Sequence, residues 1–201
     1  MDSSCFLFSK EVSDKLEVYY GLIKSWQNKY NLIGSSTLKN TWERHFIDSA
    51  QLFSLLPEEK KKSFVYDIGS GAGFPGMVLA IMGRKDIILC ESNAKKCNFL
   101  EEVKKKTGAN VIIDNIRAEA LPLNSAVAVT ARAVSSLSTL LKISLPLLSK
   151  NGVCIFPKGI NWKKELLFAQ KRFHIDYKLV KSITSEKSSI IVINEARKKN
   201  A

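Results

Sequence analysis

The stretch Asp67–Gly76 (DIGSGAGFPG) is rich in glycine and joins a short apolar run to a helical pattern. Gly69, Gly71 and Gly73 allow the chain to turn sharply, and they let the backbone approach a ligand with no side chain in between. The free N–H groups at the start of the following helix then face that ligand. The spacing predicts a turn that binds a nucleotide-like cofactor, although a tight turn without a ligand would have the same residues.

An acid follows this turn at a spacing that has a chemical meaning. Glu91 lies 20 positions after Gly71, at the end of the next apolar run. A carboxylate there can accept hydrogen bonds from the two hydroxyl groups of a ribose. Because S-adenosylmethionine and NAD both contain adenosine, Glu91 is consistent with either cofactor.

Asp67 favours one of the two cofactors. Its charge would repel the pyrophosphate of a dinucleotide, whereas it would attract the ammonium group of S-adenosylmethionine, directly or through water. No Arg or Lys between Asp67 and Gly83 is present to neutralise phosphates. We therefore expect S-adenosylmethionine, and the alternative role of Asp67 is to hydrogen-bond the turn.

The composition limits the kinds of partner, metal site and cellular location that the chain can have. The chain has 201 residues, 45% of them hydrophobic, with 31 Lys+Arg against 19 Asp+Glu and a net charge of +12. This charge favours a polyanionic partner, first of all nucleic acid. The four cysteines form no CxxC pair and the two histidines are far apart, so neither a zinc site nor a disulfide is predicted. Cysteines in the reduced thiol form are typical of cytoplasmic proteins, and we expect the cytoplasm as the location. We expect no signal peptide, no membrane span and a monomer.

The elements that must position these residues alternate in type. Apolar runs predict seven strands, at Phe64–Gly69, Asp86–Glu91, Asn110–Asn115, Ala126–Ala131, Gly152–Gly159, Ile175–Ile183 and Ser189–Asn194. Helical periodicity predicts helices at Lys10–Ile33, Leu38–Leu55, Phe74–Met82, Ala94–Lys106, Leu137–Leu148 and Trp162–Gln170.

This alternation predicts an α/β fold with a mostly parallel, seven-stranded sheet whose last two strands are antiparallel. We expect residues 1–60 to form an N-terminal helical appendage that packs on a core of residues 61–201. Trp26 and Tyr30 have helical spacing and are expected in the core, with base-stacking platforms as the alternative.

Several segments together resemble one family, the bacterial small-subunit rRNA guanine-N7 methyltransferases, also called the RsmG or GidB family. The segments that carry the resemblance are WQNKYNLI (Trp26–Ile33), RHFIDS (Arg44–Ser49), DIGSGAGFPG (Asp67–Gly76), NIRAEAL (Asn115–Leu121), TARAV (Thr130–Val134) and FPKG (Phe156–Gly159).

The resemblance implies a class I (Rossmann-like) S-adenosylmethionine-dependent methyltransferase. It implies transfer of a methyl group to N7 of one guanine in the decoding-region loop of 16S rRNA, in the small ribosomal subunit. By matching positions, it implies that the cofactor site includes Gly69, Phe74, Ala118, Glu119 and Arg132, with Glu91 as the ribose acid.

Three cations, Arg117, Arg132 and Lys158, follow the predicted third, fourth and fifth strands. The carboxyl ends of parallel strands form one ligand crevice, so we expect the three to position the substrate through its phosphates or the guanine O6 edge. His45 and Asp48, three positions apart, are expected on one helix face, either over the active site or as a structural pair. Lysines at 95, 96 and 104–106 are expected as a solvated face, with contact to rRNA as the alternative.

Other functions remain open at this point. One alternative is a methyltransferase for a small molecule or a protein, which would share the cofactor site. The others are an NAD-binding oxidoreductase, for which no substrate domain is evident, and a non-enzymatic RNA-binding module.

Overall fold

The computed structural model of the chain describes residues 8–59 and 63–199. The predicted boundary between residues 60 and 61 lies outside this described part, so the division into appendage and core stays a prediction. Within the described residues, no helix is both long and apolar enough to cross a membrane.

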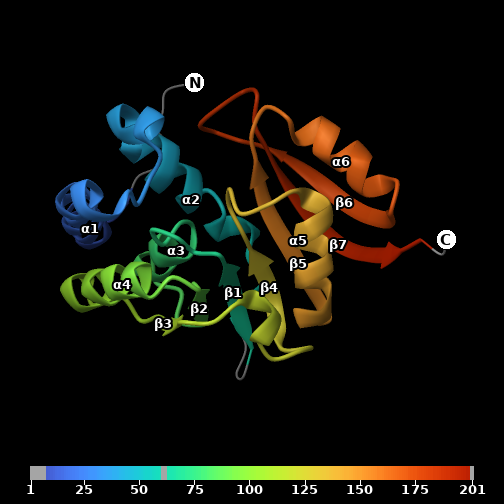
Figure 1. Cartoon of the computed structure of the whole chain (residues 1–201), viewed down its shortest axis with the longest axis horizontal. Coiled ribbons are helices and arrows are strands. Elements are labelled where there is room, and N and C mark those ends of the chain that lie inside the picture. Colours follow the sequence, from blue (N-terminus) through green and yellow to red (C-terminus); the bar gives the residue numbers. More distant parts are fainter. Residues whose placement is uncertain (1–7, 60–62, 200–201) are drawn as a thin grey trace.

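Seven strands form one sheet in the order β3-β2-β1-β4-β5-β7-β6 (Figure 1). Strands β1 to β5 are parallel, and β7 is antiparallel to both β5 and β6. The strands span Phe64–Ile68 (β1), Ile87–Cys90 (β2), Ile112–Asp114 (β3), Ala126–Thr130 (β4), Leu148–Lys158 (β5), Phe173–Lys181 (β6) and Ser189–Lys198 (β7). The predicted count and the antiparallel closing pair are confirmed.

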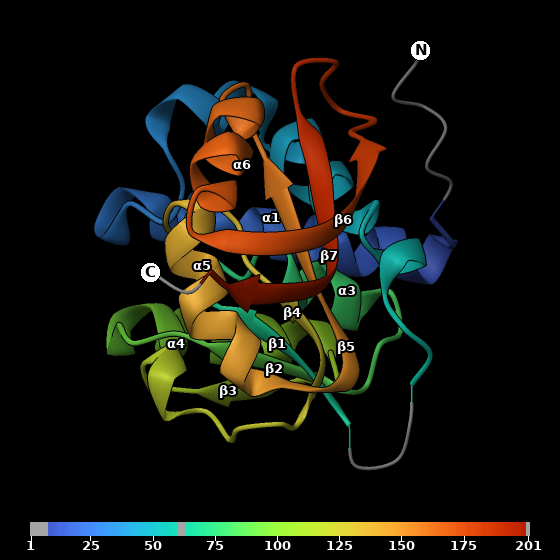
Figure 2. The ribbon, with the colours of Figure 1, turned by 90° about the vertical axis from the view of Figure 1, so that its right-hand side faces the viewer.

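Helices cover both faces of this sheet (Figure 2). One layer contains α1, α3 and α4, and the other contains α5 and α6. Their bounds are Lys10–Tyr30 (α1), Gly76–Ile81 (α3), Ala94–Thr107 (α4), Leu137–Ser144 (α5) and Trp162–Gln170 (α6). Successive strand residues alternate between the two apolar cores, as Val65 and Tyr66 do, which explains why the central strands are apolar throughout.

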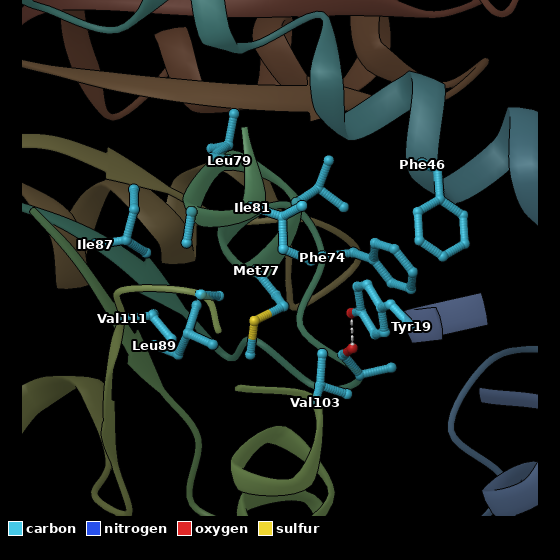
Figure 3. Close-up of a cluster of buried hydrophobic side chains, with 14 of the residues drawn as sticks. Tyr19, Phe46, Phe74, Met77, Leu79, Ile81, Ile87, Leu89, Val103 and Val111 are labelled. Carbon is cyan, nitrogen blue, oxygen red and sulfur yellow. Dashed lines mark hydrogen bonds between the residues drawn. The ribbon is translucent and has the colours of Figure 1, made fainter. Parts of the chain in front are cut away.

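Tyr19 of helix α1 packs on Phe74 at the end of the glycine-rich turn (Figure 3). The hydroxyl group of Tyr19 donates a hydrogen bond to the carbonyl oxygen of Ala72, and its ring stacks on Phe74 at 5.3 Å between centroids. Tyr19 is fully buried and belongs to the same apolar core as α3 and α4. The N-terminal helix therefore packs against the turn on the side of this apolar core.

The predicted single helix Leu38–Leu55 is wrong. The structure divides this segment into four short helical pieces: the 3-10 turn Ser35–Asn40, the π-helical turn Trp42–Ile47, α2 (Asp48–Ala50) and the 3-10 turn Phe53–Leu55. Hydroxyl groups of Thr41 and Ser49 bond to carbonyl oxygens one turn back, at 2.9 Å to Leu38 and 2.6 Å to His45. Such bonds bend helices, and π-helical turns are common at functional sites.

The predicted end of the fifth helix at Leu148 is also wrong. Helix α5 ends at Ser144, and a 3-10 turn at Leu145–Leu147 leads directly into β5. Pro146 ends the helix because it lacks an N–H group and its ring clashes with the preceding turn. Strand β5 therefore begins four residues before the predicted Gly152.

Two further short elements matter for the site. A 3-10 turn, Ala118–Ala120, follows β3. The connection between β6 and β7, residues 182–188, returns over the carboxyl ends of the parallel strands.

Candidate active site

A cavity of about 660 Å³ lies at the carboxyl ends of β1, β2, β4 and β5. Gly69, Glu91, Arg132 and Lys158 contribute to its wall from these four strand ends. Residues 32–34, 37, 44, 45 and 48 line it as well, together with residues 182, 184 and 188 of the β6–β7 connection. The carboxyl edge of a parallel sheet is where α/β proteins bind their ligands, so this cavity is the candidate active site.

The glycines of the turn have distinct roles. Gly69, Gly71 and Gly73 have φ values of +65°, +60° and +95°, which favour glycine. A Cβ on Gly71 would meet nothing closer than 3.8 Å, so its backbone is open to the cavity. A Cβ on Gly73 would lie 2.6 Å from the Tyr19 hydroxyl oxygen. Gly73 therefore allows α1 to pack and does not line the cavity.

Glu91 reaches the turn from the end of β2. Its carboxylate accepts hydrogen bonds from the N–H groups of Gly71, at 2.8 Å, and Asn93, at 2.7 Å. The side chain is mostly buried but lines the cavity. Each carboxylate oxygen keeps a lone pair for a ligand hydroxyl group, so Glu91 can fix the turn and bind a ribose together.

Asp67 lies beneath the turn and does not line the cavity. Its two carboxylate oxygens accept hydrogen bonds from the Gly76 N–H, at 3.0 Å, and the Thr130 hydroxyl, at 2.9 Å. Of the two roles that the sequence left open for Asp67, the structure shows the second: Asp67 hydrogen-bonds the turn. Complete burial raises the pKa of Asp67 to about 6, against the lowering effect of these hydrogen bonds.

We expect the substitution Asp67→Asn to change how stability depends on pH. A raised pKa in the folded state means that Asp67 favours folding below pH 4 and that this contribution is lost as pH rises through about 6. The free energy of unfolding of the wild type, relative to D67N, should fall by about 2–3 kcal/mol between pH 4 and pH 7. Urea titrations of both proteins at several pH values measure this difference, and a constant difference would contradict the assignment.

Arg132 joins the turn to the N-terminal segment. Its guanidinium carbon lies 4.9 Å from the centroid of the Phe74 ring. The two Nη groups donate to the carbonyl oxygen of Arg44 at 2.8 Å, to His45 Nδ1 at 2.6 Å and to Asp48 at 3.3 Å. The guanidinium group is thus held in one plane by its partners and by the ring below.

His45 completes this network as a neutral imidazole. Arginine only donates, so Nδ1 accepts, and Nε2 carries the proton that it shares with Thr37 Oγ1 at 2.8 Å. Burial, with the nearby charges of Arg132 and Arg44, lowers the pKa of His45 to about 3. His45 and Asp48 lie over the active site and are also a structural pair, so the two roles that the sequence left open coincide.

Lys158 lies in the cavity wall but is paired. Its ammonium group donates to the Glu165 carboxylate and to the carbonyl oxygen of Ser135, both at 2.9 Å. It therefore fixes the loop after β4 against α6. The sequence placed Arg132 and Lys158 on the rim as cations aimed at phosphates or the guanine O6 edge. The structure gives each an acidic partner, Asp48 at 3.3 Å for Arg132 and Glu165 at 2.9 Å for Lys158.

Three predicted residues do not reach the cavity wall. Arg117 and Glu119 are exposed, and Ala118 is partly buried, beyond the end of β3. They are absent from the lining of the main cavity. Their predicted roles toward cofactor and substrate stay predictions.

Sequence reasoning missed the β6–β7 connection. Thr184 donates to Asp48 at 2.8 Å, and the N–H of Ile183 donates to Gln51 at 3.0 Å. These bonds fasten a segment near the C-terminus to α2 and bring Ser182 and Thr184 into the cavity wall. No sequence signal connects residues more than 130 positions apart. Among the described residues, no cluster of His, Cys, Asp or Glu could hold a metal ion.

The solved structures that this chain resembles have the same fold. A SAM-dependent O-methyltransferase from Thermotoga maritima matches with a TM-score of 0.57 at 18% identity, over 76% of this chain and 66% of the other. A tRNA (m1A58) methyltransferase from Aquifex aeolicus matches with a TM-score of 0.54 at 19% identity, over 77% of this chain and 69% of the other. The fold is the class I methyltransferase fold.

Relatives at higher identity carry one name. The Ribosomal RNA small subunit methyltransferase G of Rhodospirillum centenum is 41% identical over 96% of this chain and 88% of the relative. The protein of the same name from Rickettsia akari is 35% identical over 94% of this chain and 97% of the relative. The GidB family model, described as rRNA small subunit methyltransferase G, matches residues 12–193. The chain belongs to the rRNA small subunit methyltransferase G family.

Proposed function

We propose that this protein transfers the methyl group of S-adenosylmethionine to N7 of one guanine in 16S rRNA. The observation that carries the proposal is the cavity at the carboxyl ends of β1 and β2, where an open glycine backbone at Gly71 meets the Glu91 carboxylate. Family membership and the net charge of +12 support RNA as the substrate.

The residues present fit this cofactor. Glu91 can bind ribose hydroxyl groups, and Gly71 exposes backbone where a ligand can approach. Gly69 also lines the cavity, with Val134 packed against it. Phe74 adds an apolar wall, buried on the side of α1. No Lys or Arg belongs to the turn itself, as expected for a cofactor without a pyrophosphate. When bound, S-adenosylmethionine supplies an electrophilic methyl group on a sulfonium.

The chain has to position the base and exclude water. N7 of guanine has a lone pair and no proton, so the reaction needs no general base. Alignment of two reactants in a closed site can supply about 7–11 kcal/mol of a reaction barrier. Arg132 is suited to this task because three partners and the Phe74 ring fix its guanidinium group at the cavity wall.

Lys158 and Arg117 have different tasks in this proposal. Lys158 positions the substrate through the loop that follows β4, because its ammonium group holds the carbonyl oxygen of Ser135. Arg117, exposed beyond β3, contacts phosphates outside the cavity.

Methyl transfer from radiolabelled S-adenosylmethionine tests the function. The acceptors are small ribosomal subunits and naked 16S rRNA from a strain that lacks this gene, and primer extension locates the modified base. We expect label at N7 of a single guanine. Binding of the cofactor without label in either RNA would instead favour a small-molecule or protein substrate.

A further inference from the structure

A second hollow lies beside the active site and is lined by residues from the end of α1 and the start of α4. Figure 1 shows these two helices on the same side of the sheet. Its volume is about 420 Å³, within the range in which proteins bind ligands. Three lysines and one aromatic ring line it: Lys29, Tyr30, Lys95 and Lys96. The remaining lining residues are polar and uncharged: Gln27, Asn28, Asn31 and Asn93.

The three lysines carry positive charge that the protein does not neutralise. In the parts of the chain that the structure describes, none of them has an acidic partner within 4.0 Å, whereas Lys158 and Arg132 do. The N–H groups of Lys95 and Lys96 are already bonded to the Asn93 side chain, at 3.0 and 3.3 Å. The free groups in the hollow are therefore the side-chain ammonium groups.

The aromatic ring in the hollow is held in place and partly exposed. Tyr30 is 38% exposed, and its ring lies 5.2 Å from that of Trp26. Trp26 is fixed in turn by a hydrogen bond of 2.8 Å from its indole N–H to Glu102. The ammonium group of Lys95 lies 5.8 Å from the centroid of the Tyr30 ring. The sequence favoured the core over a base-stacking role for Tyr30, and the structure places Tyr30 at the surface.

The hollow is continuous with the active-site cavity along the chain. Lys96 lines both. Asn31 lines the hollow, and the next two residues, Leu32 and Ile33, line the active-site cavity. An RNA chain whose target base enters the cavity can therefore continue across Lys96 into the hollow.

We propose that this hollow binds the nucleotides that flank the target base, with the lysines on phosphates and Tyr30 against an unpaired base. The proposal rests on the proposed function, because it extends the same RNA substrate beyond the cavity. Ammonium groups beside an exposed aromatic ring are the combination that binds single-stranded nucleic acid. An acidic peptide would use the charges but not the ring.

The structure also separates two groups of lysines that the sequence treated as one helix face. Lys95 and Lys96 lie at the start of α4, in the hollow. Lys105 and Lys106 lie at its end, about 15 Å away by the rise of a helix. At that end their charges interact favourably with the helix dipole, which gives them a structural role.

The test compares two double substitutions that remove equal charge. K29Q/K95Q changes exposed residues of the hollow, and K105Q/K106Q changes exposed residues at the far end of α4. We measure the affinity of each protein for a single-stranded RNA with the target guanine and its flanks, at several salt concentrations. Two lost phosphate contacts make the negative slope of log K against log salt less steep by about 1.4 and weaken binding about 10- to 30-fold near 0.1 M salt. The substitution Tyr30→Ala is expected to weaken binding at every salt concentration without changing this slope.

The outcomes separate this proposal from the proposed function. If the wild type methylates the RNA and K29Q/K95Q binds it as K105Q/K106Q does, the hollow does not bind the substrate. If K29Q/K95Q loses affinity while Y30A does not, a charged partner without a base is favoured and the stacking part fails. If the wild type transfers no methyl group to any small-subunit RNA, the proposed function fails first.

Discussion

The substitution Arg132→Ala is expected to lower the rate of methyl transfer by about 100-fold or more while the chain stays folded. Arg132 contacts Phe74, His45 and Asp48 at once. Its removal takes away the hydrogen bonds by which the loop after β4 holds the N-terminal segment at the cavity wall. Misplacement of a reacting group by about 1 Å can cost about 100-fold in rate.

The chain should stay folded when Arg132 is removed, because its partner Asp48 keeps other hydrogen bonds. Asp48 keeps hydrogen bonds from Gln51, at 2.9 Å, and Thr184, at 2.8 Å, after Arg132 is lost. We therefore expect a loss of about 1–3 kcal/mol in the free energy of unfolding. The substitution Arg132→Lys should rescue little activity, because an ammonium group cannot make the same set of planar contacts.

Arg172→Ala is a matched control. Arg172 also lies over an aromatic ring, that of Phe168, at 5.3 Å, but on the exposed surface away from the cavity. Rates at saturating cofactor and RNA, with thermal unfolding of each variant, make the comparison. An R132A protein that keeps activity within threefold of R172A would remove Arg132 from the positioning machinery.

The fold could be predicted where local pattern and tertiary packing agree. The seven apolar runs, the glycine turn after the first and the antiparallel pair at the end all follow from the alternation of strands and helices. The segment around His45 could not be predicted in the same way. Its apolar spacing is helical, but hydroxyl groups of Thr41 and Ser49 redirect the backbone hydrogen bonds, and spacing carries no information on that competition.

In the candidate site, too, features set by sequence spacing could be predicted and features set by tertiary contacts could not. Glu91 could be identified because the strand end and the turn place it within a fixed number of residues of Gly71. The charges of Arg132 and Lys158 were visible, but their partners Asp48 and Glu165 were not, because tertiary contacts set those pairs. Two cations expected to face phosphates therefore serve to hold the cavity wall, and the unpaired lysines lie beside α1 instead.

The substitution Glu91→Gln is expected to weaken binding of S-adenosylmethionine about 10- to 100-fold, since hydrogen bonds to a charged group contribute about 1.5–3 kcal/mol. The carboxylate accepts from the N–H groups of Gly71 and Asn93 and faces the cavity. Glutamine has the same shape but only one acceptor oxygen, so one N–H group or one ribose hydroxyl group loses its partner. Calorimetric titration measures the affinity, and Glu101→Gln, on the exposed side of α4, is the matched control.

A weaker affinity alone does not separate ribose binding from damage to the turn, so the ligand must be varied as well as the protein. Adenosine and 2′-deoxyadenosine differ by one hydroxyl group. If Glu91 accepts a bond from that group, E91Q loses affinity for adenosine but much less for 2′-deoxyadenosine, and the two changes are not additive. If Glu91 only holds Gly71 in place, E91Q weakens both ligands by the same factor. Equal losses would assign Glu91 to the turn alone, as the structure assigns Asp67.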